Sequence, residues 1–125
     1  MNAGDTFYIR DRSVDTRLWV VISDPLKGPD RVILVSVTTF ETYKEAVCLI
    51  MPGDHPQITH ESCVAYQEAR MTTLENLVAL RAGNQLSIQT PVSADLLARI
   101  RDGVSRSRRI RHKYVEILLE QGVID

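Results

Sequence analysis

The fold of this chain is decided by one stretch, RLWVVISDPLKGPDRVILVSV, at residues 17–37. Two apolar, β-branched runs (17–23 and 31–37) flank a segment with two prolines and a glycine, which predicts two strands around a chain reversal. Strands this close in sequence can be joined only by a hairpin, because a parallel connection needs a dozen or more residues. The sheet is therefore expected to be mainly antiparallel.

Further strand patterns lie on both sides of this hairpin. Residues 5–10 precede it, and residues 46–51 and 62–73 follow it, the last segment as one strand or two. Five or six short strands in so small a chain favour a strongly bent sheet or a small barrel.

The spacing of apolar residues changes from one typical of strands to one typical of helices after residue 73. Residues 73–85 open with Thr73 and have helical spacing, with Gly83 or Asn84 as the stop. Residues 87–90 then predict one more strand.

Two helices are predicted in the C-terminal part of the chain. The first covers 91–104 with Ser93 as its N-cap, and the second covers 107–122 and stops at Gly122. Gly103 and the serines that follow indicate a break near 103–107, and one long bent helix is the alternative. The class is then α+β.

A chain of 125 residues suits one domain, residues 1–125, with a barrel body at about 4–90 and a helical part at about 91–122. No apolar run is long enough for a bilayer, and the start has no signal-peptide pattern. Cys48 and Cys63 are too few for a disulfide framework. These features favour a cytoplasmic protein with reduced thiols.

The net charge of −1 conceals an uneven distribution. Between Arg99 and Lys113 seven basic residues face one acidic residue, Asp102, which leaves eight basic and fifteen acidic residues elsewhere. An acidic body with a basic C-terminal stretch is the result.

The segment GDHPQITHESC (53–63) raises the question of a metal site. His55, His60 and Cys63 are possible zinc ligands, but their spacing supplies only one of the two close pairs that structural sites use. A polar turn is the plainer interpretation, and a histidine that faces a substrate is a third. No nucleophile motif or phosphate-binding glycine loop is present, and we predict neither a metal nor a cofactor.

Arg17 and the pair Thr38–Thr39 are the first candidate site. Arg17 begins one strand of the hairpin and the threonines end the other, so the hairpin places them at the same edge of the sheet. A guanidinium holds a phosphate through two parallel hydrogen bonds, and a hydroxyl adds a third. The plainer alternative is a solvated arginine and ordinary strand threonines.

The stretches GDTFYI (4–9), RLWVVIS (17–23) and VTT (37–39) together resemble the MazF/PemK family of toxin endoribonucleases. In that family an early Gly-Asp strand is followed by a loop ending in Arg-Pro-x-x-Val-Ile-Ser, and the next strand ends at threonine or serine. The family arginine falls on Arg17 and the family threonine on Thr38 or Thr39. The resemblance covers about residues 4–72.

The resemblance implies an SH3-like barrel with a C-terminal helix, usually a homodimer, with an acidic antitoxin protein as partner. The implied activity is metal-independent cleavage of single-stranded RNA, in which the ribose 2′-hydroxyl attacks the neighbouring phosphate and leaves a 2′,3′-cyclic phosphate. Arg17 would stabilise the phosphorane, and the threonine hydroxyl would hold the phosphate. His55 or His60 is a candidate base that faces RNA, a role that the family motif does not supply.

The basic stretch has three interpretations. Arg108, Arg109 and Arg111 are candidates for binding RNA phosphates. They would otherwise bind an acidic protein such as the antitoxin, or solvate the back of two packed helices.

A non-catalytic SH3-like binding module for protein or nucleic acid is the alternative function, since small barrels host many functions. Arg17 beside the threonines favours the nuclease. The module is favoured by Leu18 in place of the family proline, by a short loop before Arg17 (RDRSVDT, 10–16) without the family's Gly-Ser-Glu pattern, and by the additional helices.

Overall fold

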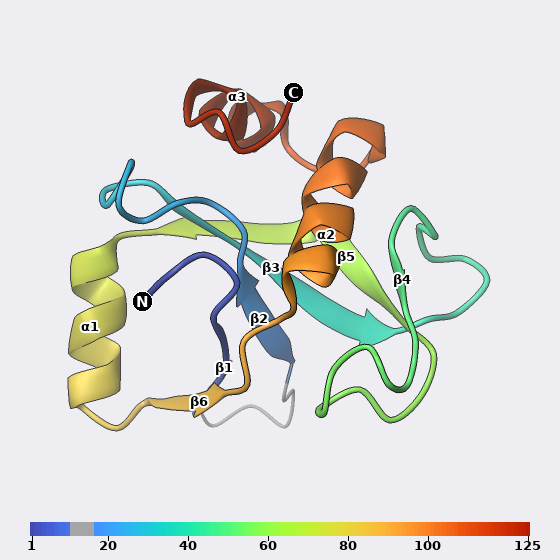
Figure 1. Cartoon of the computed structure of the whole chain (residues 1–125), viewed down its shortest axis with the longest axis horizontal. Helices are drawn as coiled ribbons and strands as arrows, with labels where there is room; N and C mark the ends of the chain where they lie inside the picture. Colours follow the sequence, from blue (N-terminus) through green and yellow to red (C-terminus); the bar gives the residue numbers. More distant parts are fainter. Residues whose placement is uncertain (11–16) are drawn as a thin grey trace.

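The computed structural model of the chain describes residues 1–10 and 17–125 (Figure 1). Within these residues, six strands form one antiparallel sheet and three helices pack around it, which confirms the predicted α+β class. The strands are β1 (Thr6–Ile9), β2 (Leu18–Val21), β3 (Val32–Thr39), β4 (Leu49–Ile50), β5 (Ser62–Thr72) and β6 (Leu86–Gln89). The helices are α1 (Leu74–Ala82), α2 (Ala94–Arg106) and α3 (His112–Glu120).

The sheet is curled, and its strands lie in the order β4-β5-β3-β2-β1-β6. Every pairing is antiparallel, as the short connections predicted. β4 and β6 stand at the two edges, so the described strands form a half-barrel. Figure 1 shows α2 crossing in front of the sheet, α3 beyond its end, and α1 at the opposite side of the molecule from β4.

β2 and β3 form the central hairpin. Leu18 pairs with Val37 and Val21 pairs with Leu34, and the residues between the strands make the predicted turn. All of β2 is buried, on both faces. Because both faces are covered, the two runs are almost continuously apolar instead of alternating with polar residues.

The sheet separates two apolar clusters. The larger cluster joins alternate hairpin residues to α2 and α3, and it includes Leu18, Val20, Ile22, Ile33, Val35, Tyr66, Leu96, Ile100 and Leu118. The smaller cluster joins the intervening residues to α1, and it consists of Phe7, Trp19, Val21, Val32, Leu34, Leu77 and Leu86. Because successive side chains of each strand point to opposite faces, one face of the hairpin packs against α2 and α3 and the other packs against α1.

Residues 62–72 form one strand, which decides between the one or two expected there. Ser36 of β3 pairs with Ala65, but Leu34 pairs with Arg70, so β5 contains extra residues between these two positions. A bulge of this kind bends the strand and increases its twist. β5 can thus pair with β3 at both ends while the sheet curls.

The other elements match the expected ones with shifted ends. β4 is shorter than the predicted strand 46–51, and β6 begins one residue before the predicted 87–90. Thr73 and Ser93 cap α1 and α2 as predicted, since their hydroxyls accept hydrogen bonds from the N–H groups of Asn76 and Leu96 at 3.0 and 3.1 Å.

Two C-terminal helices are confirmed, and the break between them lies later than the predicted 103–107. α2 continues to Arg106, and the chain leaves the helix over residues 107–111. Gly103 is buried inside α2 against Tyr66, whose hydroxyl donates to the Ile100 carbonyl at 2.7 Å. A Cβ on Gly103 would overlap that hydroxyl and lie 2.9 Å from the ring carbon Cζ. The glycine therefore marks a close contact and not a helix end.

Gln121, just after α3, ties the C-terminal part of the chain to the turn between β2 and β3. Its Oε1 accepts a hydrogen bond from the Asp24 N–H at 2.9 Å, and its carbonyl accepts one from Lys27 Nζ at 3.1 Å. A Cβ on Gly28 would overlap the Gln121 side chain. These contacts hold the central hairpin against the end of α3.

Two expectations concern the redox state of the cysteines and the presence of a membrane-spanning segment. Cys48 and Cys63 are free and buried, and burial raises the pKa of both thiols, which keeps them protonated and unreactive. Among residues 1–10 and 17–125, no helix has the length and hydropathy that a bilayer span requires.

Gly103→Ala is expected to lower the free energy of unfolding by about 1–3 kcal/mol, because the new methyl group overpacks against Tyr66. The same change in a Tyr66→Phe background should cost less, because the overlapping hydroxyl is gone. Urea denaturation of the variants measures both effects. Ser105→Ala, at an exposed position of the same helix, is the control, and an equal cost of Gly103→Ala in both backgrounds would contradict the assignment.

Candidate functional site

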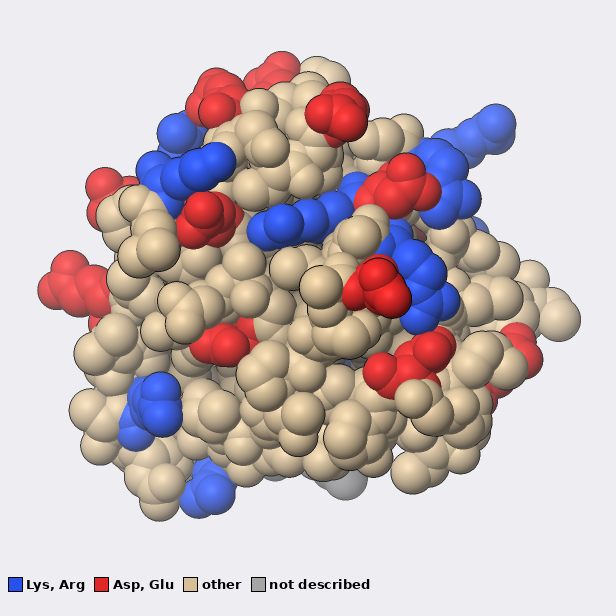
Figure 2. Space-filling view, viewed as in Figure 1, with Lys and Arg blue, Asp and Glu red and all other residues tan. Residues whose placement is uncertain are grey.

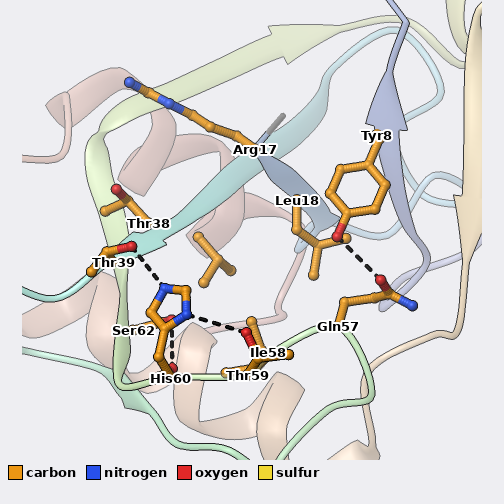
Figure 3. Close-up of a pocket in the computed structure, with 11 residues that line it drawn as sticks. Tyr8, Arg17, Leu18, Thr38, Thr39, Gln57, Ile58, Thr59, His60 and Ser62 are labelled. Carbon is orange, nitrogen blue, oxygen red and sulfur yellow. Dashed lines mark hydrogen bonds between the residues drawn. The ribbon is translucent and has the colours of Figure 1, made fainter. Parts of the chain in front are cut away.

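A pocket of about 310 Å³ opens at the end of the central hairpin (Figure 3). β2 and β3 form one wall, β1 contributes Tyr8, and the segment that leads into β5 forms the rest. The lining residues are Tyr8, Arg17, Leu18, Val37, Thr38, Thr39, Gln57, Ile58, Thr59, His60 and Ser62.

The structure brings Arg17, Thr38 and Thr39 to this one pocket, as the hairpin predicted. The register is the reason, because Leu18 opposite Val37 places the residue before β2 beside the end of β3. Arg17 Nη1 lies 3.3 Å from a carboxylate oxygen of Glu68 on β5, and both side chains are partly exposed. In Figure 3 the guanidinium lies at the rim, turned toward β5.

His60 also faces this pocket, where its ring contacts the end of β3. Its Nε2 lies 2.7 Å from Thr39 Oγ1, and its Nδ1 lies 3.2 Å from Thr59 Oγ1. The Ser62 hydroxyl donates to the His60 carbonyl at 2.9 Å and fixes the backbone there. Each ring nitrogen thus has a hydroxyl partner that can rotate away, and the ring itself is exposed at the pocket.

Lys44 contacts the end of β3 beside the pocket, a position that the sequence analysis did not predict. Its Nζ donates to Thr38 Oγ1 at 3.2 Å and to the Thr39 carbonyl at 2.7 Å. Lys44 lies in the connection between β3 and β4, which has no periodic pattern and no motif from which its direction could be predicted. Lys44 and His60 therefore contact the two threonines, and Arg17 lines the same pocket.

The opposite wall of the pocket is less polar. The Tyr8 hydroxyl donates to Gln57 Oε1 at 3.2 Å, and the apolar side chains of Leu18 and Ile58 lie beside this pair. One side thus suits an anion, while the other offers an aromatic ring, an amide and apolar surface to an organic group attached to it.

His55 does not face the pocket, which corrects its expected contact with RNA. It is buried, and its ring bridges two backbone groups: Nδ1 accepts from the Gln57 N–H at 3.1 Å, and Nε2 contacts the Thr90 carbonyl. Because Nδ1 accepts, the ring carries its proton on Nε2 and donates it to that carbonyl. His55 fastens the loop to the segment after β6 and has no free nitrogen for RNA.

Arg108, Arg109 and Arg111 lie outside the pocket, in or next to the connection between α2 and α3. Arg111 instead lines a separate open cavity of about 320 Å³ with residues of β5 and Tyr114. Glu68, the partner of Arg17, also lines this cavity.

The basic residues of α2 are largely engaged in other contacts. Arg99 pairs with Asp54 at 3.1 Å, Arg106 pairs with Asp102 at 3.0 Å, and Arg101 donates to the Ile22 carbonyl at 2.8 Å. Figure 2 shows basic and acidic side chains side by side over this helix. The basic residues of α2 are therefore neutralised or hydrogen-bonded locally. The arginines that can face a ligand lie in the connection after α2.

The candidate metal ligands do not assemble. In the part of the chain that the structure describes, no three His, Cys, Asp or Glu side chains are grouped closely enough to hold a metal ion. His55 and Cys63 are buried, whereas His60 is exposed at the pocket.

No protein-family model matches this chain, and no curated protein is similar to it in sequence. The resemblance to the MazF/PemK family therefore remains a prediction from the quoted motifs.

His55→Ala is expected to destabilise the fold much more than His60→Ala. Loss of the buried His55 ring leaves a carbonyl and an N–H group unpaired, and should lower the free energy of unfolding by about 1–3 kcal/mol. Loss of the exposed His60 ring should change it by less than about 0.5 kcal/mol. Urea denaturation of the two variants makes the comparison, and equal stabilities would contradict these roles.

Proposed function

We propose that this protein is a toxin-type endoribonuclease that cleaves single-stranded RNA without a metal ion, on an SH3-like barrel. The observation that carries the proposal is that Arg17, Thr38, Thr39 and His60 line one open pocket, with Lys44 in contact with Thr38. The grouping matches what the family resemblance implied for Arg17 and the threonines, and adds two groups that the motif lacks.

The polar side of the pocket has the chemistry of a phosphate site. The Thr38 and Thr39 hydroxyls lie beside cations or the imidazole, and each can turn its proton toward a phosphate oxygen. Arg17 lines the same pocket, and in our proposal its guanidinium turns from Glu68 to this phosphate and binds it with two parallel hydrogen bonds. Lys44 adds a second positive charge at the rim.

Cleavage needs an attack by the ribose 2′-hydroxyl on the adjacent phosphorus. In our proposal the Thr39 hydroxyl turns from His60 Nε2 to the phosphate, and the freed Nε2 takes the proton of the 2′-hydroxyl. The bond from O2′ to phosphorus forms, and the bond from phosphorus to O5′ breaks. The leaving O5′ takes a proton from water at the open mouth, and the hydroxide that remains takes the proton back from His60. Arg17 and Lys44 stabilise the additional negative charge of the phosphorane, which is the role that a metal ion has in other nucleases.

The opposite wall would hold the nucleoside. Tyr8 offers a ring on which a base can stack and Gln57 offers an amide for its edge, as in other proteins that bind single-stranded RNA. The substrate class is therefore single-stranded RNA, whose bases are free to turn into a pocket of this size.

The proposal includes the setting that the resemblance implies. The partners are an acidic antitoxin protein and a second copy of the chain in a homodimer, and the place of action is the cytoplasm. Growth arrest on expression in bacteria, relieved by a small acidic protein, tests this part.

The contact between Arg17 and Glu68 favours the alternative, a binding module without catalysis. A phosphate has to compete with this carboxylate for the guanidinium, and Leu18 follows Arg17 where the family has proline. The unusual loop before Arg17 falls on residues 11–16, which lie outside the described residues.

Arg17→Ala should lower the cleavage rate by about 10²–10³-fold, because it removes a charged donor from the place where charge develops. Arg17→Lys should also be impaired, since an ammonium cannot make the two-pronged contact. Gel analysis of a long single-stranded RNA, with EDTA present throughout, measures the rates.

Arg31→Ala is the matched control, because Arg31 is also an exposed arginine with a carboxylate partner, Glu120 at 3.1 Å, but lies outside the pocket. It should cleave at the wild-type rate. Full activity of folded Arg17→Ala would contradict the site. RNA binding without cleavage by the wild type would favour the binding module.

A further inference from the structure

The connection between α2 and α3 is docked on the connection between β3 and β4. The Ser107 hydroxyl donates to Glu45 Oε1 at 2.6 Å, and the Arg108 N–H donates to Glu45 Oε2 at 2.9 Å. Arg109 Nη2 donates to the Tyr43 carbonyl at 3.1 Å. Three hydrogen bonds thus join segments more than sixty positions apart in the sequence.

Ser107 also fixes the shape of the basic connection. Its hydroxyl oxygen accepts hydrogen bonds from the N–H groups of Arg109 and Ile110 at 3.1 and 3.2 Å. The backbone that carries Arg108 and Arg109 is therefore held in place before any ligand arrives. A held cation loses less conformational entropy on binding than a free one.

Tyr43 is the exposed aromatic residue of this surface, with 70% of its surface accessible. A hydrogen bond to the Glu41 carboxylate raises the pKa of the Tyr43 hydroxyl, so the ring stays neutral. Lys44 Nζ lies 5.8 Å from the ring centroid, and the Arg109 guanidinium contacts the backbone of the same residue. A neutral exposed ring with one cation near its face and a second cation at its backbone can stack a base and hold the adjoining phosphate.

Lys44 connects this surface to the pocket. The same Nζ that lies near the Tyr43 ring contacts Thr38 Oγ1 at 3.2 Å and the Thr39 carbonyl at 2.7 Å. A strand of RNA whose scissile phosphate sits at the threonines therefore has Tyr43 within reach of a neighbouring nucleotide.

We propose that Tyr43 and Arg109 form a second subsite for single-stranded RNA, in which Tyr43 stacks a base next to the scissile phosphate and Arg109 contacts that nucleotide's phosphate. The subsite rests on the proposed function, because it extends the same RNA beyond the catalytic pocket. It gives a function to Arg109, which does not line the pocket.

The surface fits RNA better than an acidic protein segment. Glu41 and Glu45 lie in the same segment, so its charge is mixed, and the exposed ring is its main open feature. The Glu45 carboxylate is already occupied by two donors. Stacking uses the ring directly, whereas a carboxylate-rich peptide gains from it only apolar contact.

The test measures cleavage and binding separately. Wild type, Tyr43→Ala, Tyr43→Phe, Arg109→Ala and Arg109→Lys are assayed for KM and kcat on a single-stranded RNA of about ten nucleotides. Affinity is measured by fluorescence anisotropy at several salt concentrations, on RNA with 2′-O-methyl groups, which binds but lacks the attacking hydroxyl. Arg81→Ala, an exposed arginine at the end of α1 on the opposite side of the molecule from β4, is the charge control.

Tyr43→Ala should weaken binding by about 5- to 150-fold and raise KM with kcat unchanged, since a flanking base binds equally in ground and transition states. Tyr43→Phe should keep wild-type affinity. Arg109→Ala should reduce the slope of log affinity against log salt by about 0.7, the value for one phosphate contact on a single strand. Arg109→Lys should restore the slope, and Arg81→Ala should change nothing.

The two proposals fail in distinguishable ways. If the wild type cleaves, Arg17→Ala does not, and Tyr43→Ala and Arg109→Ala behave as wild type, the subsite is wrong and the pocket stands. If the wild type neither binds nor cleaves RNA, the proposed function itself is wrong. If these two variants instead lose affinity for a poly-glutamate peptide and keep it for RNA, the surface is a protein-binding site and the subsite is overturned.

Discussion

The register of the central hairpin is the constraint on which the rest of the structure depends. With Leu18 opposite Val37, alternate side chains of β2 and β3 point into two different clusters, one held by α2 and α3 and the other by α1. A slip of one residue would exchange the two faces along the whole hairpin. The same register places Arg17 beside Thr38 and Thr39, so the interaction that organises the core also assembles the pocket.

The electrostatics of the pocket are local. The chain carries a net charge of −1, and the basic residues of α2 are paired with acids or with a carbonyl, so the molecule as a whole has little long-range attraction for RNA. Screening at physiological salt limits such forces to about 8–10 Å in any case. What remains is the short-range arrangement of Arg17, Lys44 and His60, with Glu68 as the carboxylate with which any anion competes for the arginine.

The sequence predicted those parts of the fold and the site that follow from local rules. Periodicity and turn chemistry are enough to predict the hairpin and the helix caps at Thr73 and Ser93. They also predict that Arg17 and the two threonines lie at the same edge of the sheet. The role of Gly103 was missed because it depends on a contact with Tyr66, which is distant in the sequence. Lys44 was missed because it lies in an irregular connection, where no period predicts the direction of a side chain. His55 and His60 lie five residues apart in the same segment, and the sequence does not distinguish them. In the structure His55 is buried and contacts the Thr90 carbonyl, whereas His60 is exposed at the pocket.

The hydrogen bond from the Asp24 N–H to Gln121 joins positions that are 97 residues apart. It therefore affects the order in which parts of the chain can fold during synthesis. Synthesis releases the central hairpin long before α2 and α3 exist, so Val20, Ile22 and Ile33 emerge without the helices that cover them. The nascent chain therefore displays an uncovered apolar strand surface throughout the synthesis of its middle third. This surface is covered only when α2 and α3 pack on it, and the contact of Gln121 with the turn forms last because it needs the end of α3.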